Sequence, residues 1–129
     1  GWILLGFILG AVEALMTYLG LSAYPPFRLA ALHALTVGGL GTLLLGIGTR
    51  VSLGHSGRGL ATSPAHNALF YAYQLVPIAR VLPDMLGFWW PHWAVQGYWS
   101  GVGWALAFAL WLLLFDRILR SPRDDGHPG

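Results

Sequence analysis

The titratable side chains of this sequence are few, and several stand inside long apolar stretches. Glu13, His33, Arg80 and Asp84 are of this kind. An imidazole in such a place can ligate haem iron or copper, hydrogen-bond Glu13, or cap a backbone carbonyl. Because burying charged or titratable groups is costly, each of these residues is a functional candidate.

Arg80 and Asp84 are four residues apart, which places them on one face of a helix. They form either a mutual ion pair or a site where Arg80 anchors an anionic cofactor group, such as a haem propionate, through its planar fork. Glu13 is either a protonated carboxyl bonded to a neighbouring helix, or a proton relay or metal ligand. Met16 offers only a weak thioether ligand.

Three further basic residues lie close together along the chain. Arg50, His55 and Arg58, flanked by glycines, predict a basic loop that either holds an anion or is simply solvated. His92 is the second candidate metal ligand, although its neighbours Trp90, Pro91 and Trp93 favour an interfacial anchor. The chain has no cysteine, which excludes thiolate ligands and thiolate catalysis.

The composition indicates which elements must position these groups. Of the 129 residues, 56% are hydrophobic and 9% are charged, which is typical of an integral membrane protein and excludes an ordinary soluble domain. All the basic residues apart from histidine are arginines that mostly flank apolar stretches, so no nucleic-acid partner is expected. Motifs of soluble enzymes, such as a P-loop or a Rossmann glycine fingerprint, are missing.

Four apolar stretches are long enough to cross a bilayer, at residues 2–21, 29–49, 67–87 and 94–115. We therefore predict an all-α fold, a transmembrane bundle of four helices formed by residues 1–120, with a flexible cytoplasmic tail at residues 121–129. Ser63 and Pro64 predict an N-cap and a first helical residue. The glycine-rich residues 53–59 are not expected to continue a helix.

The distribution of arginines predicts the orientation of the bundle. Four helices place both termini and the His55 loop on one side, which carries five arginines, against Arg28 alone on the other side. The positive-inside rule then puts the termini in the cytoplasm. A rise of 1.5 Å per residue places Glu13, Met16, His33 and Arg80 roughly 16–22 Å above the inner boundary, in the outer half of the bilayer.

Small residues recur at every fourth position on three of the predicted helices. Such stripes allow close packing of helices with each other or with another membrane protein. The three stripes are Gly6, Gly10 and Ala14; Ala34, Gly38, Thr42 and Gly46; and Gly97, Gly101, Ala105 and Ala109. We expect the chain to contact membrane lipid and either other membrane subunits or copies of itself.

The segment from His33 to Arg58, with Thr-Arg-Val-Ser-Leu-Gly-His-Ser-Gly-Arg at residues 49–58, resembles the signature of the NnrS family. The closing Arg-Asp-Asp-Gly-His-Pro-Gly of residues 123–129 is similar to the usual end of that family. The resemblance covers the chain from Ala30 onward and corresponds to the last four helices of longer members. Those members often carry a histidine soon after a Trp-Ile-Leu start, where this chain has Leu5, Gly6 and Phe7.

The resemblance implies a bacterial inner-membrane protein that carries haem or copper and is linked to nitric oxide metabolism. On this interpretation His33 is the favoured ligand, Arg80 stabilises negative charge and Glu13 tunes the site. Two alternatives stay open. One is a cofactor-free structural subunit of a larger respiratory complex, and the other is a small transporter with Glu13 and Arg80 on its pathway.

Overall fold

The structure is a computed structural model that describes residues 1–21, 27–86, 97–124 and 126. This part of the chain is helical and has no strand, which confirms the predicted all-α fold. In chain order the helices are α1 (Trp2–Tyr18), α2 (Phe27–His33), the π-helix η1 (Ala34–Leu40), α3 (Gly41–His55), α4 (Pro64–Tyr73), α5 (Leu75–Leu86) and α6 (Tyr98–Arg120).

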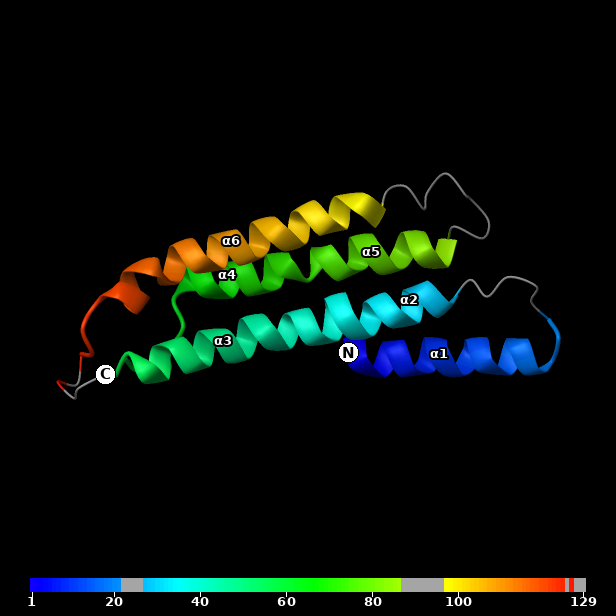
Figure 1. The fold of residues 1–129 in the computed structure, drawn as a ribbon, viewed down its shortest axis with the longest axis horizontal. Helices are drawn as coiled ribbons and strands as arrows, with labels where there is room; N and C mark the ends of the chain where they lie inside the picture. Colours follow the sequence, from blue (N-terminus) through cyan, green and yellow to red (C-terminus); the bar gives the residue numbers. More distant parts are fainter. Residues whose placement is uncertain (22–26, 87–96, 125, 127–129) are drawn as a thin grey trace.

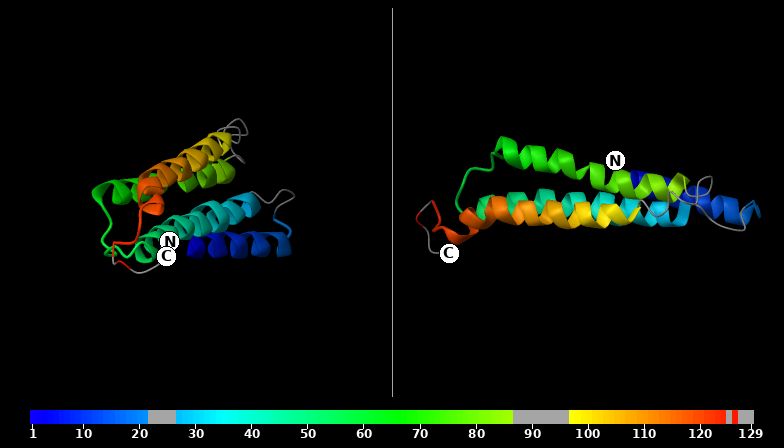
Figure 2. Two further views of the ribbon diagram at one scale, coloured as in Figure 1. Left: turned by 60° about the vertical axis from the view of Figure 1, so that its left-hand side comes forward. Right: turned by 90° about the horizontal axis from the view of Figure 1, so that it is seen from above.

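The helices form an elongated bundle (Figures 1 and 2). Helices α2, η1 and α3 follow one another as one long helix, and α4 and α5 run back along it beside α6 (Figure 1). The segments Phe27–His55 and Tyr98–Arg120 are long and apolar enough to cross a membrane, whereas α1 is a shorter apolar helix. Four complete crossings therefore stay a prediction.

The helix boundaries near the basic residues differ from the prediction. Helix α3 continues through Gly54 to His55, so the expectation that residues 53–59 interrupt the helix holds only after His55. The helix ends in a Schellman motif, in which Gly57 has φ +69° and the Arg58 N–H donates to the Leu53 carbonyl at 3.1 Å. The N-cap prediction is confirmed, because α4 begins at Pro64 with the Ser63 hydroxyl as its cap.

The predicted third helix is broken at Gln74, between α4 and α5. The cause is Pro77, which has no N–H and whose ring excludes the helical position of the Tyr73 carbonyl four residues earlier. The Gln74 side chain accepts a hydrogen bond from Trp2 Nε1 at 2.8 Å and donates to Thr42 Oγ1 at 3.4 Å. The break thus supplies a polar junction between α1, α3 and the α4–α5 helix.

The π-helix η1 directly follows His33 and is fixed from the neighbouring helix. The Tyr73 hydroxyl donates to the Val37 carbonyl at 2.6 Å. A Cβ atom at Gly41 would collide with that hydroxyl, so only glycine lets the tyrosine reach the backbone of the long helix. Wide π-turns of this kind are frequent at functional sites.

Helix α1 begins beside the middle of the long helix, and not at the end that carries the chain after α6 (Figure 1). The Trp2 side chain lies against Gly38, where a Cβ atom would come within 2.6 Å of it, and Gly6 lies against Leu35. These glycine contacts fix Trp2 at the level of η1. That both termini share the cytoplasmic side stays a prediction.

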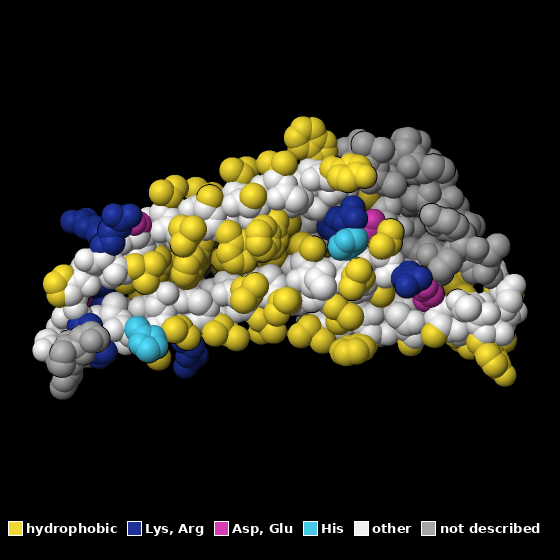
Figure 3. Space-filling view, in the orientation of Figure 1, with side chains coloured by type: hydrophobic (Ala, Val, Ile, Leu, Met, Phe, Trp, Pro, Cys, Tyr) yellow, Lys and Arg dark blue, Asp and Glu magenta, His cyan; other side chains and the backbone are white. Residues whose placement is uncertain are grey.

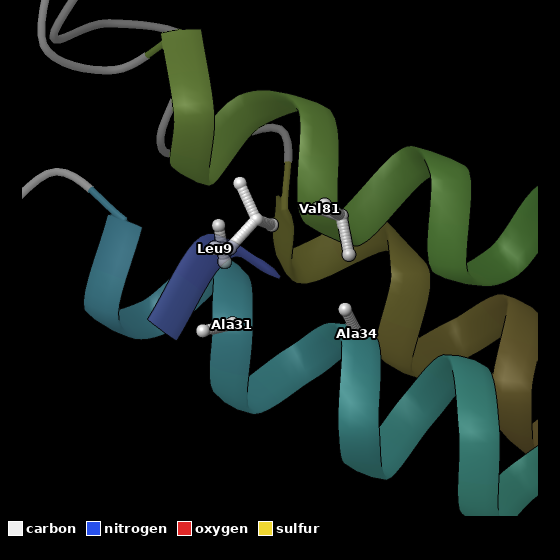
Figure 4. Packing of buried hydrophobic residues seen from close by; sticks show 5 residues of the cluster. Leu9, Ala31, Ala34 and Val81 are labelled. Atoms are coloured by element: carbon white, nitrogen blue, oxygen red, sulfur yellow. The ribbon is translucent and has the colours of Figure 1, made fainter. Parts of the chain in front are cut away.

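Two apolar clusters hold the bundle together. The seam cluster joins α1, α2, η1 and α5, and its members are Leu9, Ala30, Ala31, Ala34 and Val81. Figure 4 shows Ala34 and Val81 pointing toward one another across this contact. The aromatic cluster joins α3, α4, α5 and α6, with Leu45, Tyr73, Val76 and Ala107 as its buried members.

The three small-residue stripes have different surroundings. Gly6 and Gly38 lie at helix contacts within the chain. Gly101, Ala105 and Ala109 of α6 are exposed, and a Cβ atom at Gly101 would meet nothing within 4 Å among the described residues. Only Gly97, at the start of this stripe, is buried and meets another element within the described part of the chain.

Candidate functional site

His33 is the last residue of α2, and it faces α5, which carries Arg80 and Asp84 one turn apart. The two helices approach closely because the residues between them are small. Ala30 and Ala34 are fully buried, and Val81 packs against them. The seam cluster therefore brings the three polar side chains together.

The three side chains form a connected polar triad. His33 Nδ1 lies 2.6 Å from Asp84 Oδ2, and Arg80 Nη1 lies 3.5 Å from Asp84 Oδ1. The Nε and Nη2 atoms of Arg80 lie 3.3 and 3.4 Å from His33 Nε2. The expected Arg80–Asp84 ion pair is present, but the closest partner of Asp84 is His33, and His33 does not bond to Glu13 as the sequence had suggested.

These contacts determine where the imidazole carries its proton. A guanidinium can only donate hydrogen bonds, so His33 Nε2 accepts from Arg80 and bears a lone pair. The proton of the neutral ring is then on Nδ1, which donates it to the Asp84 carboxylate. This bond is short and charge-assisted, and it fixes the orientation of the ring.

An open cavity of about 360 Å³ borders His33 and Arg80. Its other walls come from η1 and from the start of α6, namely Val37, Gly97, Tyr98, Ser100, Gly101 and Trp104. Figure 3 shows a histidine, a basic and an acidic side chain gathered among apolar side chains, with a second basic–acidic pair nearby on the same face. The volume is within the range of about 300–1,000 Å³ that is common for small-molecule sites.

Gly97 provides the room for the Arg80 guanidinium. A Cβ atom at this position would collide with Nη1 of Arg80. The backbone of Gly97 has φ −60° and ψ −24°, which any residue can adopt, so space and not conformation requires glycine here. Arg80 is thus enclosed by Asp84, His33 and Gly97.

The comparison with known families assigns the chain to a family. A family model described as NnrS protein matches residues 1–123. The chain belongs to the NnrS family. The match includes the first helix, which had resembled the family only loosely, and it links the chain to nitric oxide-related function. No curated protein and no solved structure matches the chain.

The triad fits one part of the metal site that NnrS membership implies. A histidine that ligates a metal usually donates its second N–H to a carboxylate or carbonyl, and His33 and Asp84 have this arrangement. Within the described ranges, no group of three or more His, Cys, Asp or Glu side chains could hold a metal ion. The residues fit a single imidazole ligand with a guanidinium beside it, and any further ligand must come from elsewhere.

Of the other proposed ligands, those that the structure describes do not join His33. His92 lies outside the described residues. Neither Glu13 nor Met16 lines the cavity at His33. Glu13 instead borders a second open cavity of about 570 Å³ between α1 and α2, together with Arg28, and its Oε2 atom is buried with no hydrogen-bond partner among the described residues.

The basic residues at the other end of the bundle are engaged in different ways. Arg58 pairs with Asp124 at 2.9 Å and donates to the Ser121 hydroxyl at 3.0 Å. Arg50 lies within α3, and His55 is its last residue. The predicted anion-binding loop of Arg50, His55 and Arg58 stays a prediction. Arg58 already contacts a carboxylate of the chain itself, that of Asp124. The flexibility of residues 121–129 also stays a prediction.

Proposed function

We propose that this NnrS-family chain is an inner-membrane protein or subunit that supports a haem or copper site, with His33 as a ligand, in nitric oxide or respiratory redox metabolism. The observation that carries the proposal is the His33 imidazole, whose Nδ1 is held by Asp84 and whose Nε2 accepts from Arg80 beside the cavity that both residues line. Arg80 would stabilise a negatively charged group of the cofactor. Glu13 and Met16 are left out of this site because neither lines the cavity.

When bound, haem or copper would supply one-electron chemistry or a binding position for a small diatomic ligand. The chain's own contribution is to orient the imidazole, to keep it in one tautomer and to place a guanidinium beside it. A carboxylate behind the ring also raises the basicity of the ligating nitrogen.

An absorption spectrum and a metal analysis of the purified chain test this proposal. We expect a haem or copper signal in the wild type that is lost in His33→Ala. His55→Ala is the matched control, because His55 is exposed at the far end of the long helix. A signal that persists unchanged in His33→Ala would show that His33 is structural.

The same proposal places the His55 end of the bundle in the cytoplasm. The Arg58–Asp124 contact supports it, since it joins the arginine-rich ends of α3 and α6 on one side. Because the chain has no cysteine, a single introduced thiol can be labelled selectively. A membrane-impermeant maleimide added outside intact cells should label Tyr18→Cys and spare Gly59→Cys; labelling of Gly59→Cys would reverse the orientation.

The second candidate, a cofactor-free structural subunit, is favoured by the exposed α6 stripe. Small residues promote helix association in lipid, where apolar drive between helices is absent. We expect the chain to self-associate in mild detergent and Ala105→Leu to weaken this association. A monodisperse wild-type monomer would contradict self-association through this stripe.

A further inference from the structure

The two ring nitrogens of His33 are held with very different strength. On the Nδ1 side the carboxylate lies at 2.6 Å, a short charge-assisted contact. On the Nε2 side two Arg80 nitrogens share one lone pair at 3.3 and 3.4 Å, both longer than a typical N–H donor distance of about 2.9 Å. Asp84 therefore fixes the ring, and the hydrogen bonds from Arg80 to Nε2 are the weaker contact, which breaks more readily.

The guanidinium can also move without leaving the seam between α2 and α5. Its Nη1 atom lies 3.5 Å from Asp84 Oδ1, on a carboxylate whose side chain is only 6% exposed. The cavity on which Arg80 borders gives it room to turn. A rotation of its terminal torsions would thus uncover Nε2 and leave the ion pair intact.

We propose that Arg80 guards His33: its guanidinium occupies the Nε2 lone pair that a metal needs, and ligation requires its displacement into the neighbouring cavity. The inference rests on the proposed function of His33 as a ligand and adds the control of access to it. Arg80 then has two positions. In one it contacts His33 when no metal is bound, and in the other it faces the negatively charged group of a bound cofactor. Gly97 gives the guanidinium room in the guarding position, since a Cβ atom there would meet Nη1 of Arg80 and shift the guanidinium.

Chemical modification of the imidazole tests the guard without any metal. Diethylpyrocarbonate is uncharged and acylates a free imidazole nitrogen, so its rate reports whether a lone pair is covered. Cleavage after arginine gives two separate peptides, residues 29–50 and residues 51–58. The single histidine of the first is His33, and that of the second is His55. Mass spectrometry of the full chain in detergent therefore gives both rates from one sample, with His55 as the internal control.

Two variants that keep the positive charge separate occupancy from electrostatics. Gly97→Ala keeps Arg80 but shifts its guanidinium from its position beside His33. Arg80→Lys keeps a cation but removes the guanidinium nitrogens that reach His33 Nε2. We expect the modification rate of His33 to rise about fivefold in each variant, the factor that corresponds to one lost hydrogen bond. The rate of His55 should not change.

Unchanged His33 rates in both variants, with the His55 rate also unchanged, would overturn the guard. The outcome is independent of the spectrum that tests the proposed function. If the rates rise and no preparation binds haem or copper, the ligand assignment fails while the covering of Nε2 by Arg80 stands. If His33-dependent absorption is found and the rates do not rise, only the guard is wrong.

Discussion

Two arginine–aspartate pairs lie at opposite ends of the long helix, and they differ in what surrounds the carboxylate. The arginines are similarly exposed, 22% for Arg80 and 26% for Arg58. The Asp84 side chain is 6% exposed and also holds His33, whereas that of Asp124 is 54% exposed. The first pair is part of a part-buried triad at a cavity, built on a buried carboxylate, and the second joins the chain after α6 to the end of α3.

The difference shows that the carboxylate determines the role of each arginine. A buried carboxylate in an apolar surrounding needs every available donor, because an unpaired charge there is strongly destabilising. An exposed carboxylate is solvated by water and gains little from a partner. The same two residue types therefore organise a candidate ligand site in one place and a surface contact in the other.

Removal of the buried carboxylate should have the largest effect. We expect Asp84→Ala to lower the stability by about 3 kcal/mol, at the lower end for breaking a buried pair, since Arg80 and His33 both lose their acceptor. Thermal unfolding in detergent measures the loss. Asp116→Ala, which breaks the exposed pair with Arg120 on α6, is the control and should have little effect. Equal losses would contradict the distinction between the two pairs.

Separation of the helices that form the triad should have the next largest effect. Ala34, the first residue of η1, is fully buried against α5, so Ala34→Leu must push the long helix and α5 apart, at a cost of about 2 kcal/mol for overpacking. The unfolding midpoint should fall clearly. Ala109→Leu, on the exposed side of α6, should leave it nearly unchanged. An unchanged unfolding midpoint in Ala34→Leu would mean that the seam cluster is loosely packed.

The link between the aromatic cluster and the π-helix should contribute less. Tyr73→Phe removes the hydrogen bond to the Val37 carbonyl, and we expect a loss of about 1 kcal/mol. The control is Tyr71→Phe, because Tyr71 is 72% exposed. Chemical denaturation of both variants decides whether η1 depends on this bond; identical midpoints would show that it does not.

The exposed pair should show the smallest effect. Asp124→Ala removes the partner of Arg58, and we expect a change below about 1 kcal/mol. Because salt screens exposed charges, this small difference should vanish at high ionic strength, whereas the effect of Asp84→Ala should persist. Unfolding curves at low and high salt test this. A loss of stability in Asp124→Ala that does not change with salt would show that the Arg58–Asp124 pair behaves like the Arg80–Asp84 pair.

Local chemistry explains which structural features were predictable from the sequence. Ser63 and Pro64 carry the N-cap signal of α4 in two residues, and the prediction is confirmed. The break at Gln74 also had a local signal in Pro77, which the apolar pattern of residues 67–87 concealed. The long helix runs past Thr49 because its end is set by Gly57 and not by Gly54.

The site was only partly predictable, because its decisive contact is not local. The spacing of Arg80 and Asp84 indicates their ion pair, which the structure contains. The bond between His33 and Asp84 joins residues 51 positions apart. It depends on how α2 meets α5 at Ala30 and Ala34, and depth alone could not distinguish Asp84 from Glu13 as the partner of His33.

The protonation pattern of the His33 ring tests the central claim most directly. In the chain labelled with ¹⁵N-histidine and placed in lipid nanodiscs, the His33 resonances are those that disappear in His33→Ala. We predict that the neutral ring carries its proton on Nδ1 and leaves Nε2 unprotonated, as the contacts with Asp84 and Arg80 require. A proton on Nε2 of the neutral ring would contradict the contact with Arg80 and with it the guarding role.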